Sequence, residues 1–458
     1  MIRPTTARCA LALTAALGLA GCVAYAPAPP QVAAFPQAFD ARRLDEAPAG
    51  TAWTGAELLK AALARNPRIA EARAKYAVAL AAARTAKLIP GPTFTLTAEY
   101  ASEHPHWGYG AGADLPLDYG ARRSTRLGTA DLQALQAWYD YGEAAWTVRT
   151  ALAKAGVELD SAAHEIPLAE RLVALRRERL ARLEARVRAG EDARTVALTA
   201  QTELSAAEQR LAAARGRRAA ALASLAQALG VSPAAVAEVR VEAPAGPAAL
   251  SELPTWRRDA ALSRRDVLRA VADYDLAENA LRLEVAKQYP EVRIGPGYQY
   301  DHGVDKLPFN LSLVLPSYDL NRRAIDQAET ARAAAGRTLE AVQADALAAV
   351  DTAAAALAAA QADRSRIADR AVPAAHEAAA AAARALRAGE GDRTDDLAAR
   401  AAELDAELTL LDARRTQALA AADLEDALRR AFDPAETATL QAALTPPSAA
   451  TIASGGPR

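Results

Sequence analysis

The sequence has little of what enzymes and disulfide-rich proteins use. Its 458 residues include only two cysteines, one methionine and five histidines, and aromatic residues make up 5%. Two cysteines cannot build a disulfide framework, and no spacing of His, Cys or acidic residues matches a metal site. No nucleophile motif is present, and a formal net charge of −2 leaves no basic footprint for nucleic acid. We therefore predict no catalysis, no bound metal and no cofactor apart from a covalent lipid.

The histidines lie near the ends and bends of the predicted elements. His104 and His106 fall in one predicted hairpin loop, His302 falls in another, and His164 and His376 lie near predicted helix kinks. We interpret them as solvated residues. The alternative is a cluster of the three loop histidines that touches metal ions passing an outer mouth.

Alanine and a long internal repeat dominate the sequence. It is 52% hydrophobic, a balance typical of long, closely packed helices. The segment from Pro90 to Tyr100 corresponds to the segment from Pro290 to Tyr300, and Arg-Ala-Gly-Glu at 188–191 returns at 387–390. Because the offset stays at 198 to 200 residues, we interpret the chain as a duplicated β-β-α-α module. The predicted repeats span 51–240 and 255–435.

The first 21 residues have the pattern of an export signal. Arg3 and Arg8 precede an apolar run from Leu11 to Leu19, which is too short to span a membrane as a helix. The sequence Leu-Ala-Gly-Cys at 19–22 resembles a bacterial lipoprotein box, which implies that Cys22 is lipidated and begins the mature chain. The alternative is an ordinary secretory signal that contains a cysteine.

The two ends of the mature chain are low in complexity. Residues 22–50 form a Pro/Ala-rich linker without periodicity, which would let a lipid anchor sit apart from the folded body. Residues 436–458 are predicted to be a low-complexity tail, and we expect the part from Pro446 onward to be disordered.

Four segments alternate between apolar and polar or small residues, as half-buried strands do. They are predicted at about 92–102, 107–117, 291–300 and 307–316, joined in pairs by hairpin loops at 101–106 and 301–306. Roughly ten residues suffice for a tilted strand to cross a bilayer, and the aromatic residues near one end suit an interfacial girdle. These predicted girdle residues are Tyr100, Trp107, Tyr298 and Tyr300. The alternative is a soluble β-ribbon packed on a helix.

Four strands cannot close a membrane barrel by themselves. Membrane barrels begin at about eight strands, and an open sheet edge in lipid is costly. Other copies of the chain must therefore close the barrel. Three copies would supply twelve strands and a lumen lined by Thr, Gly, Asn and Ser, although the strand count alone also allows two or four copies.

Helix-forming sequence flanks each pair of strands. Ala56 to Lys87 precedes the first strand, and Ala121 to Arg188 after the second predicts a helix of about 100 Å with a kink at Pro167. Its counterpart from Arg322 to Arg387 is interrupted at Pro373. These lengths exceed those of globular helices and predict a long coiled or tubular assembly.

Both long helices end at a glycine, Gly190 or Gly389, that is predicted to take the left-handed conformation. Helices from Arg194 to Leu229 and from Thr394 to Phe432 then run back. The two turns are therefore predicted to be the tips of hairpins that project away from the membrane.

From about residue 51 to 435 the chain resembles the TolC-type outer-membrane efflux factors, the outer membrane efflux lipoprotein family. The resemblance is carried by the duplicated order, Leu-Pro-Leu at 115–117, Leu-Val-Leu-Pro at 313–316, the Arg-Ala-Gly-Glu tips and the upstream lipoprotein box. It implies a trimer with a twelve-stranded barrel in the outer membrane and a helical barrel in the periplasm. It also implies partners, namely a periplasmic adaptor protein and an inner-membrane pump.

The resemblance assigns roles to the tips. Adaptor docking is expected at Arg188, Gly190, Thr195, Arg387, Gly389 and Thr394. Acidic residues after the second tip narrow the periplasmic mouth in this family, a role that falls on Asp395 with Asp392 and Asp396 beside it. Ala398 stands where a second acidic residue is common, so the constriction is either looser or uses Asp396. The alternative is that these aspartates only cap the helix.

Two other functions compete with an efflux duct. A periplasmic adaptor can also be a lipoprotein with helical hairpins, but it predicts one hairpin flanked by small β-domains. A structural coiled-coil lipoprotein of the outer membrane would keep the same fold without a pump.

Overall fold

The computed structural model describes residues 25–44, 52–102, 104–242 and 251–445. The chain divides into two compact units, the first ending at Arg42 and the second beginning at Arg43. In the first, a 3₁₀ helix, η1 (Val32–Ala34), leads into α2 (Phe35–Asp40), where two phenylalanine rings stack 5.9 Å apart. The predicted linker therefore contains one short helix. The predicted signal peptide and Cys22 lie outside the described residues.

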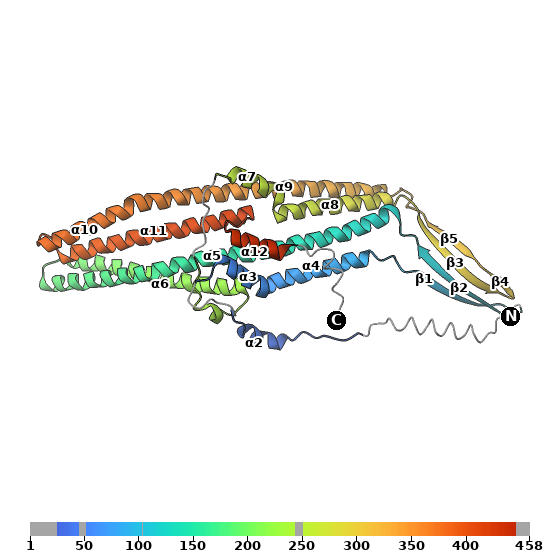
Figure 1. Cartoon of the computed structure of the whole chain (residues 1–458), viewed down its shortest axis with the longest axis horizontal. Helices are drawn as coiled ribbons and strands as arrows, with labels where there is room; N and C mark the ends of the chain where they lie inside the picture. The colour runs from blue at the N-terminus through green and yellow to red at the C-terminus, as the bar shows by residue number, and fades with distance from the viewer. Residues whose placement is uncertain (1–24, 45–51, 103, 243–250, 446–458) are drawn as a thin grey trace. The chain divides into compact units, whose positions relative to one another are not determined.

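In the second unit, both halves of the chain follow one order: two helices, paired strands and two long helical segments (Figure 1). The first half contains α3 (Gly55–Arg65), α4 (Pro67–Ala86), β1 (Thr93–Tyr100), β2 (Trp107–Pro116), α5 (Gly120–Ala189), α6 (Arg194–Leu229) and η2 (Pro233–Val236). The second half contains α7 (Leu253–Ser263), α8 (Arg265–Ala286), β3 (Glu291–Asp301), β4 (Val304–Lys306), β5 (Phe309–Val314), α9 (Arg322–Arg366), η3 (Ile367–Ala371), α10 (Val372–Ala388), α11 (Arg393–Leu428) and α12 (Pro434–Leu444).

The helix predicted at 56–87 is broken at Asn66, and the break recurs in the second half. Asn66 has an extended backbone, its side chain caps α4, and its amide donates to the Ala228 carbonyl at 2.7 Å, near the end of α6. Arg264 has the same role between α7 and α8, because it donates to the Ala427 carbonyl at 2.6 Å, near the end of α11. Each break thus holds its pair of helices against the last long helix of the same repeat, which is α6 in the first half and α11 in the second.

The strands form one antiparallel sheet in the order β1, β2, β3, with β4 and β5 both paired to β3. The predicted fourth strand is therefore two short strands on either side of Pro308, which has no N–H to donate to the ladder. The register is the same on both sides, with Lys306 opposite Gln299 and Phe309 opposite Pro296.

The two hairpins differ in their turns. The first strand pair ends at Tyr100 and resumes at Trp107, as predicted. The loop predicted at 301–306 is too long, because β3 continues to Asp301, β4 occupies Val304–Lys306, and His302 and Gly303 form the turn. Both have positive φ, 45° and 102°, as expected for a two-residue hairpin turn.

The long helices are confirmed. Helix α5 has 70 residues, which corresponds to about 105 Å, and it continues through Pro167. Its counterpart in the second half, α9 to α10, is interrupted by the π-helical turn η3 just before Pro373. Proline lacks the backbone N–H that a regular helical turn needs. Gly190 and Gly389 end α5 and α10 with φ of 80° and 76°, as predicted.

The C-terminal part departs from the prediction. Helix α11 ends at Leu428, four residues before the predicted Phe432, because Arg429 takes the left-handed conformation with φ of 51°. The chain then forms α12, whose Glu436, Leu440 and Leu444 are buried. The prediction of a low-complexity tail from residue 436 is therefore wrong for 436–444, and 446–458 lie outside the described residues.

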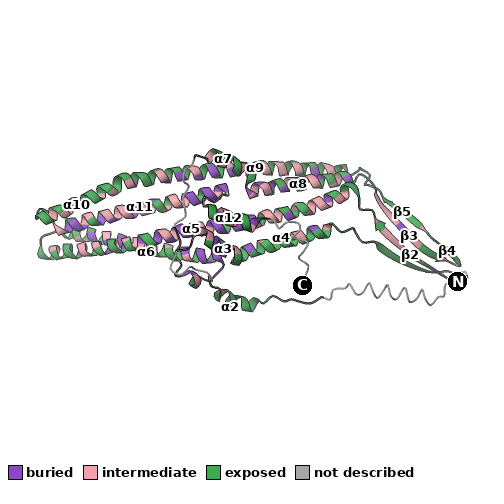
Figure 2. Cartoon of the chain, in the orientation of Figure 1, coloured by how far each residue is buried: buried purple, intermediate pink, exposed green. Residues whose placement is uncertain are grey.

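Buried side chains gather between the helices (Figure 2). Three clusters consist mainly of alanine and leucine, and small side chains allow α5, α6 and α11 to pack closely. In the described part of the chain, the strands pack extensively only against one another. This arrangement argues against the alternative of a soluble ribbon packed on a helix.

Candidate functional site: a two-faced sheet and two hairpin tips

The register of the sheet brings most apolar residues of β1, β2, β3 and β5 onto one face. Leu96 lies opposite Ala111, and Ile294 lies between Leu115 and Leu311. This face is open, because Leu96 is 84% exposed and Leu311 is 61% exposed. The other face is mostly polar or small and carries Thr93, Thr95, Thr97, Glu99, Gly108, Gly110, Gly112, Asp114, Arg293, Gly295, Gly297, Gln299, Asn310 and Ser312. An apolar surface of this extent marks contact with lipid or with another protein.

Aromatic residues gather near the hairpin turns, where the girdle is predicted. Tyr100 lies opposite Trp107 with ring centres 5.1 Å apart. Tyr300 lies opposite Tyr109, whose ring stacks on Trp107 at 6.2 Å, and Tyr298 follows one residue pair further along. The structure therefore brings the four residues together and adds Tyr109, which the sequence placed on the apolar face but not in the girdle.

A second set of exposed aromatic residues lies at the other end of the sheet, where strands meet helices. Tyr119 precedes α5, Tyr289 precedes β3 and Tyr318 precedes α9, and all three are exposed. Alternation along the strands does not identify them, because all three lie outside the predicted strands. A usable signal was present, since Tyr119 and Tyr318 are separated by 318 − 119 = 199 residues, the offset of the repeat.

The predicted docking residues at the tips are exposed with one exception. Arg188, Gly190, Thr195, Arg387 and Gly389 are all exposed. Thr394, by contrast, is buried, and its hydroxyl donates to Asp392 at 2.7 Å. Thr394 is therefore not exposed in this structure, and its part in docking stays a prediction. The tips also differ at the next matched position, because Leu198 is 56% exposed whereas Leu397 is buried.

The three aspartates after the second tip have different surroundings. Asp396 is fully buried and pairs with Arg393 at 2.9 Å and Arg400 at 3.1 Å. Asp392 accepts the Thr394 hydroxyl hydrogen bond, which lowers the pKa of its carboxyl below the ordinary value. Asp395 is exposed, and in the described part of the chain its carboxylate takes part in no ion pair or hydrogen bond. Because Asp396 is buried, it is poorly placed to replace the acidic residue that Ala398 lacks at the periplasmic mouth. Asp395 is the remaining candidate for a charge at the mouth.

Ion pairs join the two hairpins near their tips. Arg186 on α5 pairs with Asp192 at 2.8 Å and also contacts Asp392 in the other hairpin. Arg393 on α11 pairs with Glu178 on α5 at 3.3 Å. These contacts hold the two tips side by side, and the sequence could not indicate them because the partners are about 200 residues apart.

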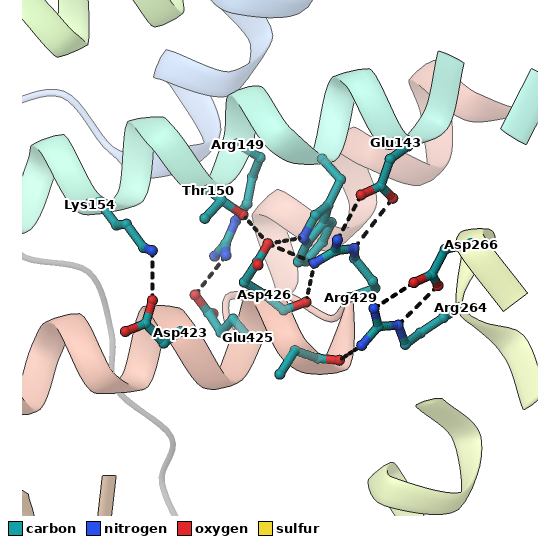
Figure 3. Close-up of polar contacts among 12 residues, drawn as sticks. Glu143, Arg149, Thr150, Lys154, Arg264, Asp266, Asp423, Glu425, Asp426 and Arg429 are labelled. Atoms are coloured by element: carbon teal, nitrogen blue, oxygen red, sulfur yellow. Dashed lines mark hydrogen bonds and ion pairs between the residues drawn. The ribbon is translucent and has the colours of Figure 1, made fainter. Parts of the chain in front are cut away.

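Further from the tips, a polar network joins α5, α8 and α11 (Figure 3). Asp426 accepts hydrogen bonds from the Trp146 indole and the Thr150 hydroxyl, both at 2.9 Å. Arg429, just after α11, pairs with Glu143 on α5 at 2.7 Å. The network fixes the end of α11 against the middle of α5.

Arg149 lies at the centre of this region with only 3% of its side chain exposed. It pairs with Glu425 of α11 at 2.7 Å and with Glu436 of α12, whose carboxylate accepts its Nε–H at 2.6 Å. One buried cation thus faces two buried carboxylates. Burial raises the pKa of Glu436, although Arg149 opposes this effect.

The loop histidines do not form a metal centre in the described residues. The His104 and His106 rings are 4.8 Å apart, and a ring nitrogen of His302 lies 2.7 Å from Asp301. Among the described residues, no group of three or more His, Cys, Asp or Glu side chains is arranged to hold a metal ion.

Comparisons with known proteins agree with this architecture. The family model described as outer membrane efflux protein matches residues 58–231 and 256–428. The search of curated proteins found no match. Among solved structures, the outer membrane protein VceC from Vibrio cholerae is 19% identical, with a TM-score of 0.67 over 83% of this chain and 97% of that chain.

Two further solved structures share the fold at similar distance. The Neisseria gonorrhoeae MtrE outer membrane channel, in its open state, is 20% identical, with a TM-score of 0.66 over 83% of this chain and 89% of that one. The Campylobacter jejuni CmeC outer membrane channel is 12% identical, with a TM-score of 0.68 over 85% and 89%. At these identities the likeness establishes the fold alone.

Proposed function

Because the chain belongs to the outer membrane efflux protein family, we propose that three copies of it form the exit duct of a tripartite efflux system. The protein is an outer-membrane efflux channel and not an enzyme. The observation that carries the proposed assembly is the sheet, which exposes an apolar face and has two unpaired edges.

The open edges favour closure by other copies. Among the described residues, β1 pairs only with β2, and β4 and β5 pair only with β3, so both outer edges of the sheet carry free backbone groups there. Such edges are very costly in lipid, and pairing between copies removes the cost. Because β4 and β5 share one register on β3, they count as one strand interrupted at Pro308, and three copies then give twelve strands. Closure turns Thr95, Gly110 and Asn310 toward a water-filled lumen, which suits their polarity.

The helices support a long passage below the barrel. Helix α5 alone extends about 105 Å, and the alanine-rich stretch Arg322–Ala388 is long and apolar yet mostly exposed in the single chain. Exposed alanines allow close approach of a neighbouring helix. We assign this surface to contact between copies in a helical barrel.

The partners of the duct bind at the hairpin tips in this proposal. Arg188, Gly190 and Thr195 at the first tip, with Arg387 and Gly389 at the second, form the docking surface for a periplasmic adaptor that connects to an inner-membrane pump. Their exposure supports this role. We also propose that Cys22 carries a lipid that anchors the N-terminus in the outer membrane.

Mass and conductance test the assembly. The full chain, extracted from membranes in mild detergent, is expected to have the mass of three copies and to show discrete channels of low resting conductance in planar bilayers. A monomer that does not conduct would contradict the barrel and favour an adaptor or a tethered coiled coil.

We expect Asp395 to set the charge of the periplasmic mouth. In a trimer, three unpaired carboxylates near one axis concentrate negative potential, which favours cations and repels anions. Asp395→Ala is therefore expected to lower the preference for K⁺ over Cl⁻, measured as a reversal potential in a salt gradient. Glu390→Ala, an exposed carboxylate at the same tip, is the matched control. Unchanged selectivity and conductance in Asp395→Ala would leave the aspartate as a helix-capping residue only.

A further inference from the structure

The connections between strands and helices carry aromatic and basic side chains that are exposed or, at Arg123, half-buried, and we call this set the junction belt. It comprises Tyr119, Tyr289 and Tyr318 with Arg123, Arg322 and Arg323. Tyr289 is 70% exposed. The belt continues the apolar face of the sheet along the chain. Leu117 precedes Tyr119 by two residues, Leu315 precedes Tyr318 by three, and both leucines are exposed.

The belt arginines differ from their neighbour Arg122 in their side-chain partners. Arg122, beside them, pairs with Glu291 at 3.0 Å and donates to the Tyr289 carbonyl at 2.9 Å. In the described residues, by contrast, the side chains of Arg123, Arg322 and Arg323 take part in no ion pair or hydrogen bond. Neither α5 nor α9 has an acidic residue in its first turn to offset them. A cation at a helix N-terminus is unfavourable beside the helix dipole, and an anion from outside the chain would offset this effect.

An apolar cavity of about 500 Å³ opens beside the belt, between the start of α5 and the end of α8. Its lining includes Leu117, Tyr119, Leu281, Val285 and Tyr289, together with the charged side chains of Arg122, Glu278, Arg282 and Glu291. A surface that combines tyrosines, guanidinium groups and an adjoining apolar cavity matches the layered chemistry of a membrane interface: phosphate outside, glycerol next and hydrocarbon within.

We propose that the junction belt binds the headgroups of anionic glycerophospholipids in the periplasmic leaflet of the outer membrane. Arg123, Arg322 and Arg323 pair with the phosphates, for which the planar guanidinium is well suited. The tyrosines lie at the glycerol level, and the cavity takes the first part of an acyl chain. This lipid-binding role rests on the proposed placement of the sheet in the membrane. It makes the belt the periplasmic boundary of the membrane-spanning part.

The test replaces the three belt arginines together. The full-length variant Arg123→Gln/Arg322→Gln/Arg323→Gln is compared with Arg218→Gln/Arg258→Gln/Arg414→Gln, which removes three exposed arginines far along the chain from the belt. Purified protein in zwitterionic detergent is titrated with dioleoyl phosphatidylglycerol, dioleoyl phosphatidylcholine or glycerol phosphate. Native mass spectrometry counts the bound molecules.

Phosphatidylglycerol is expected to bind the unmodified protein and the control variant alike, and to bind the belt variant about 100-fold more weakly, at about fivefold for each arginine. Phosphatidylcholine and glycerol phosphate are expected to bind weakly to all three proteins. The variant with lysine at the three belt positions should recover most of the affinity for phosphatidylglycerol, which separates loss of charge from misfolding.

Equal binding of phosphatidylglycerol by the belt variant and the control would overturn the proposal, as would equal binding of the two lipids by the unmodified protein. Tight binding of glycerol phosphate would mean a site for free phosphate and would also overturn it. The same preparations are examined for channel conductance. A conducting trimer without lipid preference contradicts only the belt, whereas a monomer that does not conduct contradicts the proposed duct.

Discussion

Leu96→Arg is expected to abolish most of the membrane-inserted oligomer. Leu96 lies in the middle of β1 on the apolar face and is 84% exposed, so the arginine would meet lipid near the centre of the bilayer. A charged residue there costs about 2–4 kcal/mol in each chain, and a trimer bears that cost three times. The measurement is the amount of SDS-resistant oligomer in unheated outer-membrane extracts, together with total protein.

Thr95→Arg is the matched control, because it lies one residue away on the opposite face of the same strand. Its arginine would extend into the water-filled lumen, where the oligomer tolerates charge and only conductance and ion selectivity change. Similar loss of oligomer in both variants would show that the apolar face does not contact lipid. The pair therefore tests which face is outside, independently of whether β1 tolerates a long side chain.

Arg149→Leu is expected to be the most destabilising single change in the helical part. It leaves Glu425 and Glu436 buried without a cation, and breaking a buried pair of this kind costs about 3–5 kcal/mol. The measurement is the urea midpoint of helix loss, followed by circular dichroism in detergent. Arg257→Leu is the control, since its pair with Asp351 is exposed and solvent screens the attraction. Equal midpoints for the two variants would contradict the central role of Arg149.

Glu436→Gln separates charge from packing at the same place. Burial raises the pKa of Glu436 above the ordinary value of 4.5, so its contribution to stability is complete below that pH and is lost as the pH rises through the folded-state pKa. The glutamine variant lacks this loss. We therefore expect the unmodified protein to lose stability relative to Glu436→Gln as the pH rises above 4.5. No relative loss of stability over this range would mean that Arg149 holds Glu436 ionised throughout it.

Hydrophobic alternation and glycine positions predict most helices and strands. The errors arise at single residues whose backbone conformation these patterns do not describe. Alternation located the strands, but Pro308 splits the last one and a two-residue turn replaces its predicted loop. Glycines at 190 and 389 located the tips. The end of α11 was misplaced because Arg429, a residue that rarely takes positive φ, does so here and directs the chain into α12.

The candidate site was predicted only in part, because burial decides which of several similar residues is available. Asp395 and Asp396 are adjacent and chemically alike, yet the helix turns one outward and the other between Arg393 and Arg400. Thr195 and Thr394 occupy matched positions, yet only the first is exposed. A helical period distinguishes the faces of a helix but does not say which face a neighbouring helix covers.

The sequence by itself determined the duplication, the two-faced strands, the long alanine-rich helices and the glycine turns. These depend on periodicity and backbone preference within a few residues. Only the tertiary structure decided the partners of Arg149, one of which is 287 residues away, the burial of Asp396 and the junction belt. The physical reason is that ion pairing and burial depend on distances between helices, which closure of the fold establishes and no local pattern encodes.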